Sequence, residues 1–447
     1  MKQNTLSNQY RLRYSSIAVS IIFIYMIVYE WGVFEAIPNS IIYPVKMILP
    51  VVMLLFPIRK VIKNNNYFNN FTLLYFIFIL WSLVPSIFGG NPEESIEQWL
   101  KFISRFIFFV VAARYLITRN ESSIILMKAF VFTGIFSFVQ YILVLFFQAT
   151  NLFSFSEFEM ARGIYYGPGG ILGNVGSIMQ FPLIGDIYRF HGFWVEPSKS
   201  SGFMIACYFI SKNLYHIEKK AFWNKASYIC LAGGFLCFSN AGYLAIGVSF
   251  FFGAFMNAIN EKTSSLRFLL SSIVFIFLVF IAIFGRTYVA NNLIDNEIAR
   301  AVVGVRGGSC AGTTCGGVDY SINPSDGRLR GLNKNFGIAM EYPAGIGIRV
   351  TGKYDRKTNF RNSGGNALIE WLVYTGFIGL IIVLLRESQV LFYALKYSIR
   401  DPSVLLLTQA WLAMFIQNLL YGTIMTPAYL LVIILIFATK PQITQRS

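Results

Sequence analysis

Apolar segments long enough to cross a bilayer recur along the whole chain, and this pattern restricts the fold more than any other feature. Of the 447 residues, 55% are hydrophobic and only 13% are charged, and the mean hydropathy is +0.57. A water-soluble protein of this size needs more charge on its surface, whereas apolar runs of about 20 residues are typical of transmembrane helices. The sequence therefore predicts an all-α polytopic integral membrane protein, in which residues 1–447 form a single transmembrane domain.

The apolar run at 226–259 shows how the spans are counted. Basic clusters lie on both sides of this 34-residue run, so both of its ends should lie on the same side of the membrane. We therefore expect it to turn at Ser239–Gly242, where polar and small residues favour a turn. The same reasoning predicts about 12 transmembrane helices, with both termini in the cytoplasm, at about 16–34, 41–58, 71–88, 98–117, 124–148, 197–213, 226–239, 240–259, 267–285, 367–385, 402–420 and 422–439.

The net charge of +16 follows the same topology. The segments expected in the cytoplasm hold 20 Lys and Arg against 5 Asp and Glu, and these include Arg386 in the turn after the tenth span. The rest of the chain holds 17 against 16, so nearly the whole excess lies on one side. This is the positive-inside pattern of membrane proteins, and no nucleic-acid partner is expected.

Two long hydrophilic segments, at 149–196 and 286–366, are expected to face the periplasm. The first is rich in glycine and is either a plain flexible loop or a mobile cover over a substrate groove. The second holds 11 Lys and Arg against 6 Asp and Glu. Long loops escape the positive-inside rule. The positive charge of this segment therefore either has no functional role or forms a surface for an anionic substrate or headgroup.

The cysteines indicate no metal site. Cys310 and Cys315 lie in the second periplasmic segment, where an oxidising environment makes a disulfide possible. The chain has only two histidines, His191 and His216, which are expected on opposite sides of the membrane. We expect neither a zinc site nor any cofactor.

The strongest chemical signal is the string R-F-H-G-F-W-V-E-P-S, from Arg189 to Ser198. Proline is favoured at the first helical position, and the residue before it is kept out of helical geometry. A helix should therefore begin at Pro197, with Glu196 just before it and Lys199 in its first turn. The start of a helix favours anions, although a structural Arg–Glu pair also explains the string.

The string at 189–198 is expected at the outer boundary of the membrane. Other ionisable groups are expected at the same boundary, and each has an ordinary structural explanation as well. Asp-Gly is also a common turn, an asparagine followed by a glutamate suits a helix start, and basic side chains near a span end reach toward headgroups. Together they suit a lipid-linked phosphate substrate, with a carboxylate that activates a hydroxyl nucleophile. The residues are Arg286, Arg328 and Arg330 in the second loop, Asn366 and Glu370 at the tenth span, and Lys101 and Arg105 on the fourth.

Several strings, taken in order, resemble the Wzy family of O-antigen and capsular polysaccharide polymerases. The resemblance covers about residues 185–380, and the N-terminal third matches only in its hydropathy pattern. The strings are R-x-x-G-x-x-x-E-P-S at 189–198, F-S-N-A-G-Y at 238–243, S-D-G-R at 325–328, E-Y-P-A-G-I-G at 341–347 and N-A-L-I-E-W-L-V-Y-T-G-F-I-G at 366–379.

The resemblance implies a GT-C-like bundle similar to O-antigen ligase, in the bacterial inner membrane, with its active site facing the periplasm. The implied activity transfers an undecaprenyl-pyrophosphate-linked glycan onto a lipid-linked repeat unit, and a polysaccharide co-polymerase is an expected partner. For this reaction we assign Arg189 and Arg328 to the pyrophosphate, where charge grows in the transition state. Glu196 is the expected base for the acceptor hydroxyl, and Glu370 is the alternative base.

Two other functions remain open. The related O-antigen ligases share this layout but usually place a histidine just before the asparagine of the tenth-span motif, where this chain has Gly365. A flippase or transporter of lipid-linked oligosaccharides predicts ionisable residues near the middle of the membrane and repeated halves. The sequence pattern indicates neither feature.

Overall fold

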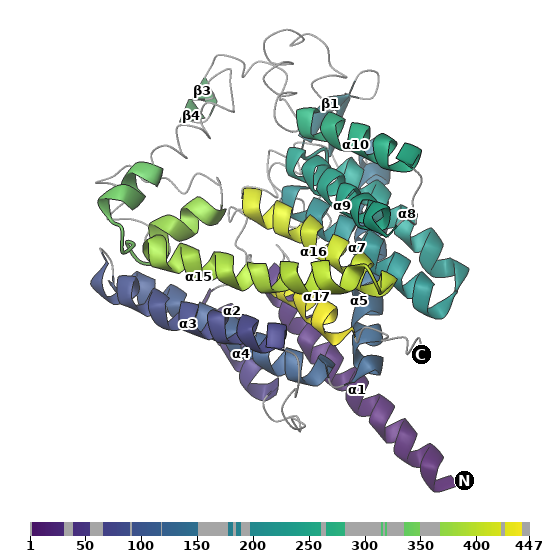
Figure 1. Ribbon diagram of the computed structural model, residues 1–447, viewed down its shortest axis with the longest axis horizontal. Helices are drawn as coiled ribbons and strands as arrows, with labels where there is room; N and C mark the ends of the chain where they lie inside the picture. The colour runs from purple at the N-terminus through teal and green to yellow at the C-terminus, as the bar shows by residue number, and fades with distance from the viewer. Residues whose placement is uncertain are drawn as a thin grey trace.

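The computed structural model is a helical bundle with two short β-hairpins outside it (Figure 1). It describes residues 2–30, 39–53, 66–89, 92–117, 119–150, 178–181, 185–188, 197–260, 265–281, 314–315, 318–319, 335–348, 367–421 and 425–439. All structural statements below concern these residues.

The helices follow one another with short turns through much of the chain. Their bounds are α1 (Lys2–Glu30), α2 (Asn39–Met53), α3 (Asn66–Phe88), α4 (Pro92–Ile117), α5 (Asn120–Ala149), α7 (Pro197–Glu218), α8 (Ala221–Leu236), α9 (Asn240–Ile259), α10 (Ser265–Phe280), α15 (Ala367–Ser398), α16 (Pro402–Tyr421) and α17 (Pro427–Ala438). A further short helix lies at 335–341.

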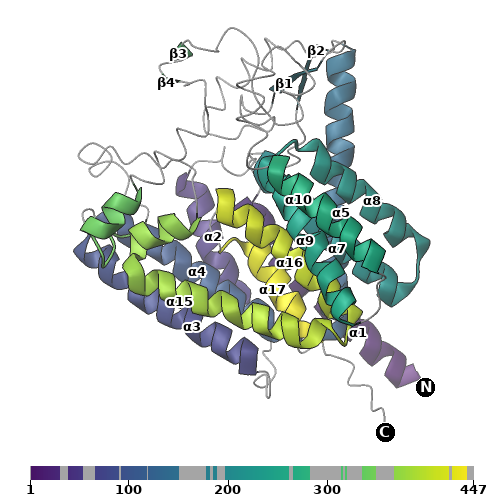
Figure 2. The same ribbon diagram turned by 45° about the horizontal axis from the view of Figure 1, so that its top comes forward.

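The strands form two separate antiparallel hairpins. Strand β1 (Ile178–Phe181) pairs with β2 (Gly185–Tyr188), and β3 (Thr314–Cys315) pairs with β4 (Val318–Asp319). Both hairpins come from the two segments predicted to leave the membrane. Figures 1 and 2 show them on one side of the bundle, with the start of α1 on the opposite side.

Each of the twelve predicted spans overlaps with a helix in the described part of the chain. The start of α7 at Pro197 is confirmed, and the helix break between Leu236 and Asn240 confirms a turn within the 226–259 run. Five helices are long and apolar enough to cross a membrane, which supports a membrane protein. The count of twelve spans stays a prediction. The five segments are Asn66–Phe88, Asn120–Leu143, Asn240–Ile259, Ala367–Ser398 and Pro402–Leu420.

The prediction that Arg386 lies in a turn after the tenth span was wrong. We expected a span at 367–385 with Arg386 in the following turn, but α15 continues to Ser398 and Arg386 is completely buried. The helix is interrupted at Gly376, where φ is 67°. The part after this break covers about 22 residues, or about 33 Å at 1.5 Å per residue, so Arg386 lies near the middle of a membrane-length helix.

The straight part of α15 runs antiparallel to α3. Near one end, the Tyr67 and Tyr393 rings meet edge to face at 5.8 Å, and Arg386 lies over Tyr75 further along. Near the other end, the Trp81 indole N–H donates to the Thr375 carbonyl at 2.7 Å. This pairing places the start of α3 beside the end of α15.

Helix α17 lies at the centre of the bundle, and all of its residues are buried. Its 12 residues rise about 18 Å, well short of the roughly 30 Å needed to cross the apolar core. Met425, just before its N-terminus, is also fully buried, so the start of α17 is enclosed by other helices. This matters for the site described next, because a helix N-terminus carries unpaired N–H groups and positive potential.

The two ends of the bundle are named here by their residues. The Glu30 end is where Glu30 of α1 meets the start of α17. The basic end is the opposite one, where α3 begins and α4 ends, and it carries Arg114, Lys128, Lys220 and Lys396.

Candidate functional site

Glu30, the last residue of α1, contacts the N-terminus of α17, whose N-cap residue is Thr426. The backbone N–H of Ala428 donates to the Glu30 carboxylate at 3.1 Å, and Thr426 forms a side-chain hydrogen bond with the same group. Pro427 occupies the first helical position, where the missing N–H costs nothing. A carboxylate is favourable at this positive helix end, so α1 and α17 together form an anion-binding corner that Glu30 itself occupies.

Basic side chains from three other helices surround this corner. Lys199 of α7 and Arg105 of α4 both interact electrostatically with Glu30. The Arg105 guanidinium lies 5.0 Å from the centre of the Tyr29 ring, and Lys46 of α2 lies 4.8 Å from the same ring. Glu30, Tyr29, Lys46, Arg105 and Lys199 are named the Glu30 cluster below.

The cations of this region rest largely on aromatic rings. Arg105 also lies 5.2 Å from the centre of the Phe102 ring, and Lys101 lies 3.9 Å from that of Tyr43. Lys101 has a carboxylate partner in Glu97 at 3.0 Å, but the Glu97 side chain is 54% exposed, and such pairs contribute little. An aromatic ring orients a cation without neutralising its charge, so the Glu30 cluster retains a positive excess.

Three buried polar atoms of the same region have no hydrogen-bond partner among the described residues. They are the Tyr29 hydroxyl, the Arg105 Nε and the Ser200 hydroxyl in the first turn of α7. Buried polar groups are normally paired. These atoms therefore offer hydrogen bonds to a bound molecule that carries acceptor oxygens.

The structure brings together four of the predicted site residues. Lys101, Arg105 and Lys199 lie at the Glu30 end, and Glu370 lies in the first turn of α15 at the same end. The residue after Glu370, Trp371, packs edge to face on Phe102 at 5.2 Å, and Phe102 is the ring beside Arg105.

The remaining predicted residues lie outside the described residues. They are Arg189, Glu196, Arg286, Arg328, Arg330, Asn366 and Cys310, together with the side chain of Cys315. The catalytic assignment of Arg189, Glu196 and Arg328, and the disulfide, therefore stay predictions.

Sequence reasoning missed Glu30 and Lys46. Glu30 was counted inside an apolar span, and Lys46 lies in the middle of the second span. A carboxylate at the boundary of an apolar run drew attention to Glu196, and the same signal could have identified Glu30. The position of Lys46 beside Tyr29 depends on tertiary packing and has no local signature.

Two of the glycine-containing strings pack against each other. In the described segment 335–348, the Ile346 and Gly347 N–H groups donate to the Val373 and Tyr374 carbonyls at 3.0 and 3.1 Å, and Phe377 N–H donates to Pro343 at 3.1 Å. A Cβ on Gly376 would lie 2.2 Å from the Pro343 carbonyl oxygen. Only glycine permits both this approach and the positive φ, so E-Y-P-A-G-I-G and the interrupted α15 form one structural unit.

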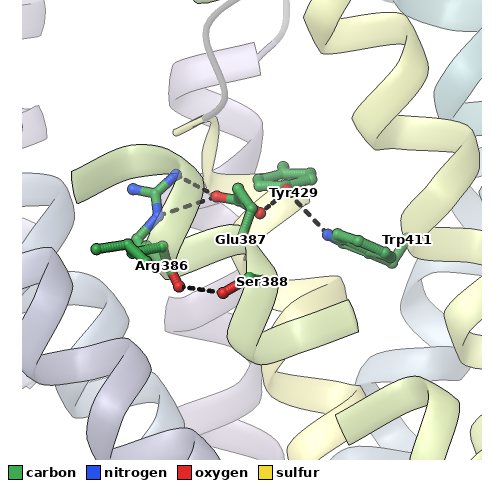
Figure 3. Close-up of polar contacts among 6 residues, drawn as sticks. Arg386, Glu387, Ser388, Trp411 and Tyr429 are labelled. Atoms are coloured by element: carbon green, nitrogen blue, oxygen red, sulfur yellow. Dashed lines mark hydrogen bonds and ion pairs between the residues drawn. The ribbon is translucent and has the colours of Figure 1, made fainter. Parts of the chain in front are cut away.

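A second charged group lies inside the bundle (Figure 3). The Arg386 Nε donates to the Glu387 carboxylate at 2.9 Å, and the Tyr429 hydroxyl donates to the other carboxylate oxygen. The Trp411 indole N–H donates to the Tyr429 hydroxyl at 2.8 Å. These four residues are named the interior network, and they join α15, α16 and α17.

Aromatic rings complete the surroundings of Arg386. Its guanidinium lies 5.4 Å from the centre of the Phe71 ring and 5.1 Å from that of Tyr75. Tyr75 interacts electrostatically with both Arg386 and Arg105, so it stands between the interior network and the Glu30 cluster. Tyr429 lies in the first turn of α17, so the interior network also fixes the helix end that Glu30 contacts.

The described residues contain no group of three or more His, Cys, Asp or Glu side chains arranged to hold a metal ion. Cys207, Cys230 and Cys237 are free thiols buried in the helical core. The chemistry of the Glu30 cluster is that of an anion site built from ammonium and guanidinium groups.

Comparison with models of known protein families finds no match for this chain. Comparison with curated proteins likewise finds no relative of significant similarity.

Proposed function

We propose that this protein is a polymerase of the O-antigen or capsular polysaccharide type. It transfers an undecaprenyl-pyrophosphate-linked glycan onto a lipid-linked repeat unit. It acts in the bacterial inner membrane at the periplasmic side, with a polysaccharide co-polymerase as partner. The observation that carries the proposal is the Glu30 cluster, where Arg105 and Lys199 interact with Glu30 at the N-terminus of α17 and Lys46 lies over the neighbouring Tyr29 ring.

The charge of this cluster fits a lipid-linked anion. A pyrophosphate calls for several cations and N–H donors together. Lys199 belongs to the helix that begins at Pro197, so the E-P-S string leads directly into the cluster. Among the described residues, Lys101, Arg105, Lys199 and Glu370 therefore retain their proposed substrate-binding roles.

The proposed reaction is a glycosyl transfer. A hydroxyl of the acceptor sugar attacks the anomeric carbon of the donor, the new C–O bond forms, and the bond to the pyrophosphate oxygen breaks. The leaving undecaprenyl pyrophosphate takes the electron pair, and nearby cations stabilise its growing charge. The proposed base Glu196 accepts the hydroxyl proton, with Glu370 as the alternative, while Arg189 and Arg328 hold the pyrophosphate with the Glu30 cluster.

A gel of surface glycolipid from a deletion strain tests this proposal. Loss of the protein should collapse the ladder to a core that carries one repeat unit, and the intact gene should restore long chains. Arg105→Gln should restore only short chains. Arg119→Gln is the matched control, because Arg119 loses the same charge but bonds to the Tyr115 hydroxyl at 2.9 Å, near the basic end of α4. Full-length chains from both variants would remove Arg105 from the site.

The predicted residues outside the described ranges are tested in the same strain. Glu196→Gln should abolish polymer while the protein remains in the membrane, as shown by immunoblotting. Arg328→Ala should shorten the polymer or abolish it. Normal chain length from either variant removes that residue from its assigned role.

One observation favours a second candidate function, a flippase or transporter of lipid-linked oligosaccharides. Arg386 and Glu387 lie inside the bundle, and ionisable residues in that position are typical of transport pathways. The same gel separates the functions, because loss of a flippase leaves no repeat unit on the core. A ligase also gives this result, but it leaves finished polymer on its lipid carrier at the periplasmic face.

A further inference from the structure

A groove on the outside of the bundle lies between α3 and α4, and its lining residue Phe106 packs edge to face on Tyr75 at 5.1 Å. Its volume is about 390 Å³, within the range of about 300–1,000 Å³ found for small-molecule sites, and Asn69, Thr72, Leu73, Phe76, Val110 and Arg114 are among its lining residues. Leu73 is 56% exposed and Phe76 is 45% exposed. Because apolar side chains this open face lipid in a membrane protein, the groove opens toward the bilayer.

The lining is polar at one end and apolar at the other. Asn69 lies in the first turn of α3 and Arg114 in the last turn of α4, and both are exposed. Phe76 and Val110 lie one to two turns further from these helix ends. The polar part is therefore at the basic end of the bundle, and the apolar part points toward its middle, which is the polarity of a membrane lipid.

We propose that this groove binds an anionic glycerophospholipid, with its phosphate at Arg114 and the first part of an acyl chain along Leu73, Phe76 and Val110. Basic pockets between helices at a membrane surface are the usual sites for anionic headgroups. An arginine gives paired hydrogen bonds to phosphate oxygens. A neutral phospholipid offers the same chain but no net charge for Arg114.

The location distinguishes this lipid from the proposed substrate. Arg105 and Arg114 lie on the same helix, nine positions apart, which is about 13 Å along its axis. The Glu30 cluster lies around Arg105, whereas the groove runs along α4 from Phe106 to Arg114. The headgroup position at Arg114 is thus separate from the proposed polymerase site.

Native mass spectrometry of the purified full-length protein tests the proposal. The protein is reconstituted with equal amounts of phosphatidylglycerol and phosphatidylcholine, and the lipid retained on each molecule is counted. Wild-type protein should retain phosphatidylglycerol in preference. Arg114→Ala should weaken that retention about fivefold, the effect of one basic residue near an anionic surface, while leaving phosphatidylcholine unchanged.

Two further variants make the result specific. Arg119→Ala removes the same charge from the turn after α4, where Arg119 lies 4.7 Å from the centre of the Tyr115 ring, and it should bind phosphatidylglycerol like wild type. Val110→Trp fills the groove without changing charge and should reduce retention of both lipids. Equal retention of the two lipids by wild type, or equal losses in Arg114→Ala and Arg119→Ala, would overturn the proposal. The arginine pair decides the matter even if Val110→Trp does not fold.

Discussion

The Glu30 cluster and the interior network both contain arginine, a carboxylate and tyrosine, but they satisfy their charges in opposite ways. In the interior network, Arg386 is paired with Glu387, and the Tyr429 hydroxyl and the Trp411 indole N–H extend the hydrogen bonds from the carboxylate. In the Glu30 cluster, the carboxylate is engaged by a helix N-terminus, and the cations lie against aromatic rings.

The difference teaches which of the two groups is built to receive a ligand. In a buried ion pair, each charge compensates the other, and this holds both side chains in place. The Tyr29 and Phe102 rings orient the Arg105 guanidinium without neutralising its charge. The Glu30 cluster is therefore the better candidate for binding an anion, and the interior network is the better candidate for holding α15, α16 and α17 in position.

The first prediction concerns the interior network and has the largest expected effect on stability. Arg386→Met leaves Glu387 buried without its cation, and we expect it to lower the free energy of unfolding by about 3–5 kcal/mol. SDS titration of the purified protein measures this loss. The double variant Arg386→Met/Glu387→Leu should recover most of it, because an apolar pair replaces the ion pair. If the double variant is as unstable as the single one, the ion pair contributes interactions that an apolar pair cannot replace.

The second prediction concerns backbone shape at the interrupted α15. Gly376→Ala adds a methyl group 2.2 Å from the Pro343 carbonyl at a position where φ is 67°. Strain of this kind costs about 1–3 kcal/mol, which the same titration measures. Gly337→Ala is the control, because a Cβ there meets nothing within 4 Å. Equal behaviour of the two variants would mean that the contact between the 335–348 segment and α15 does not hold in the membrane.

The hydropathy pattern could predict the helices but not how the interior is arranged. Pro197 begins α7 and Asn240 begins α9, as local rules for proline and turns predict. Arg386 was misplaced because a charge after an apolar run resembles a span end. Its true position depends on Glu387 and on rings from α3 that a local pattern cannot show.

The residues of the candidate site could also be predicted only in part from the sequence. Lys101, Arg105 and Lys199 were predicted because each lies near the expected end of an apolar span. Such a position can be recognised from the sequence of a single helix. Their meeting around Glu30 required α17 to begin inside the bundle. Nothing in the apolar run at 422–439 indicates this, because the short helix is as hydrophobic as a complete span.

The third prediction tests the Glu30 cluster directly. Arg105→Gln removes a cation from the Tyr29 and Phe102 rings, at a cost of about 1 kcal/mol, yet it should reduce polymer length strongly in cells. A large loss of function with a small loss of stability is the reverse of what Arg386→Met should show. Measuring both quantities on both variants separates a ligand site from a structural one. A stability loss above that of Arg386→Met would break the comparison.

The fourth prediction uses Glu218, which is paired like Glu387 but lies at the basic end. Its bonds to Lys128 and to the Trp223 indole N–H lower the pKa of Glu218 to about 2 from 4.5. Because its folded pKa is depressed, the stabilisation is present above about pH 4.5 and is lost as the pH falls toward 2. Such a pair near the surface contributes less than about 1 kcal/mol.

Glu218→Gln should therefore be slightly less stable than wild type at pH 7 and nearly equal to it near pH 2. Lys128→Met should show the same convergence, since it removes the main cause of the low pKa. Unfolding midpoints measured across this pH range give the result. If Glu218→Gln costs as much as Arg386→Met, then pairing rather than burial sets the energetic scale, and the contrast between the two charged groups loses its physical basis.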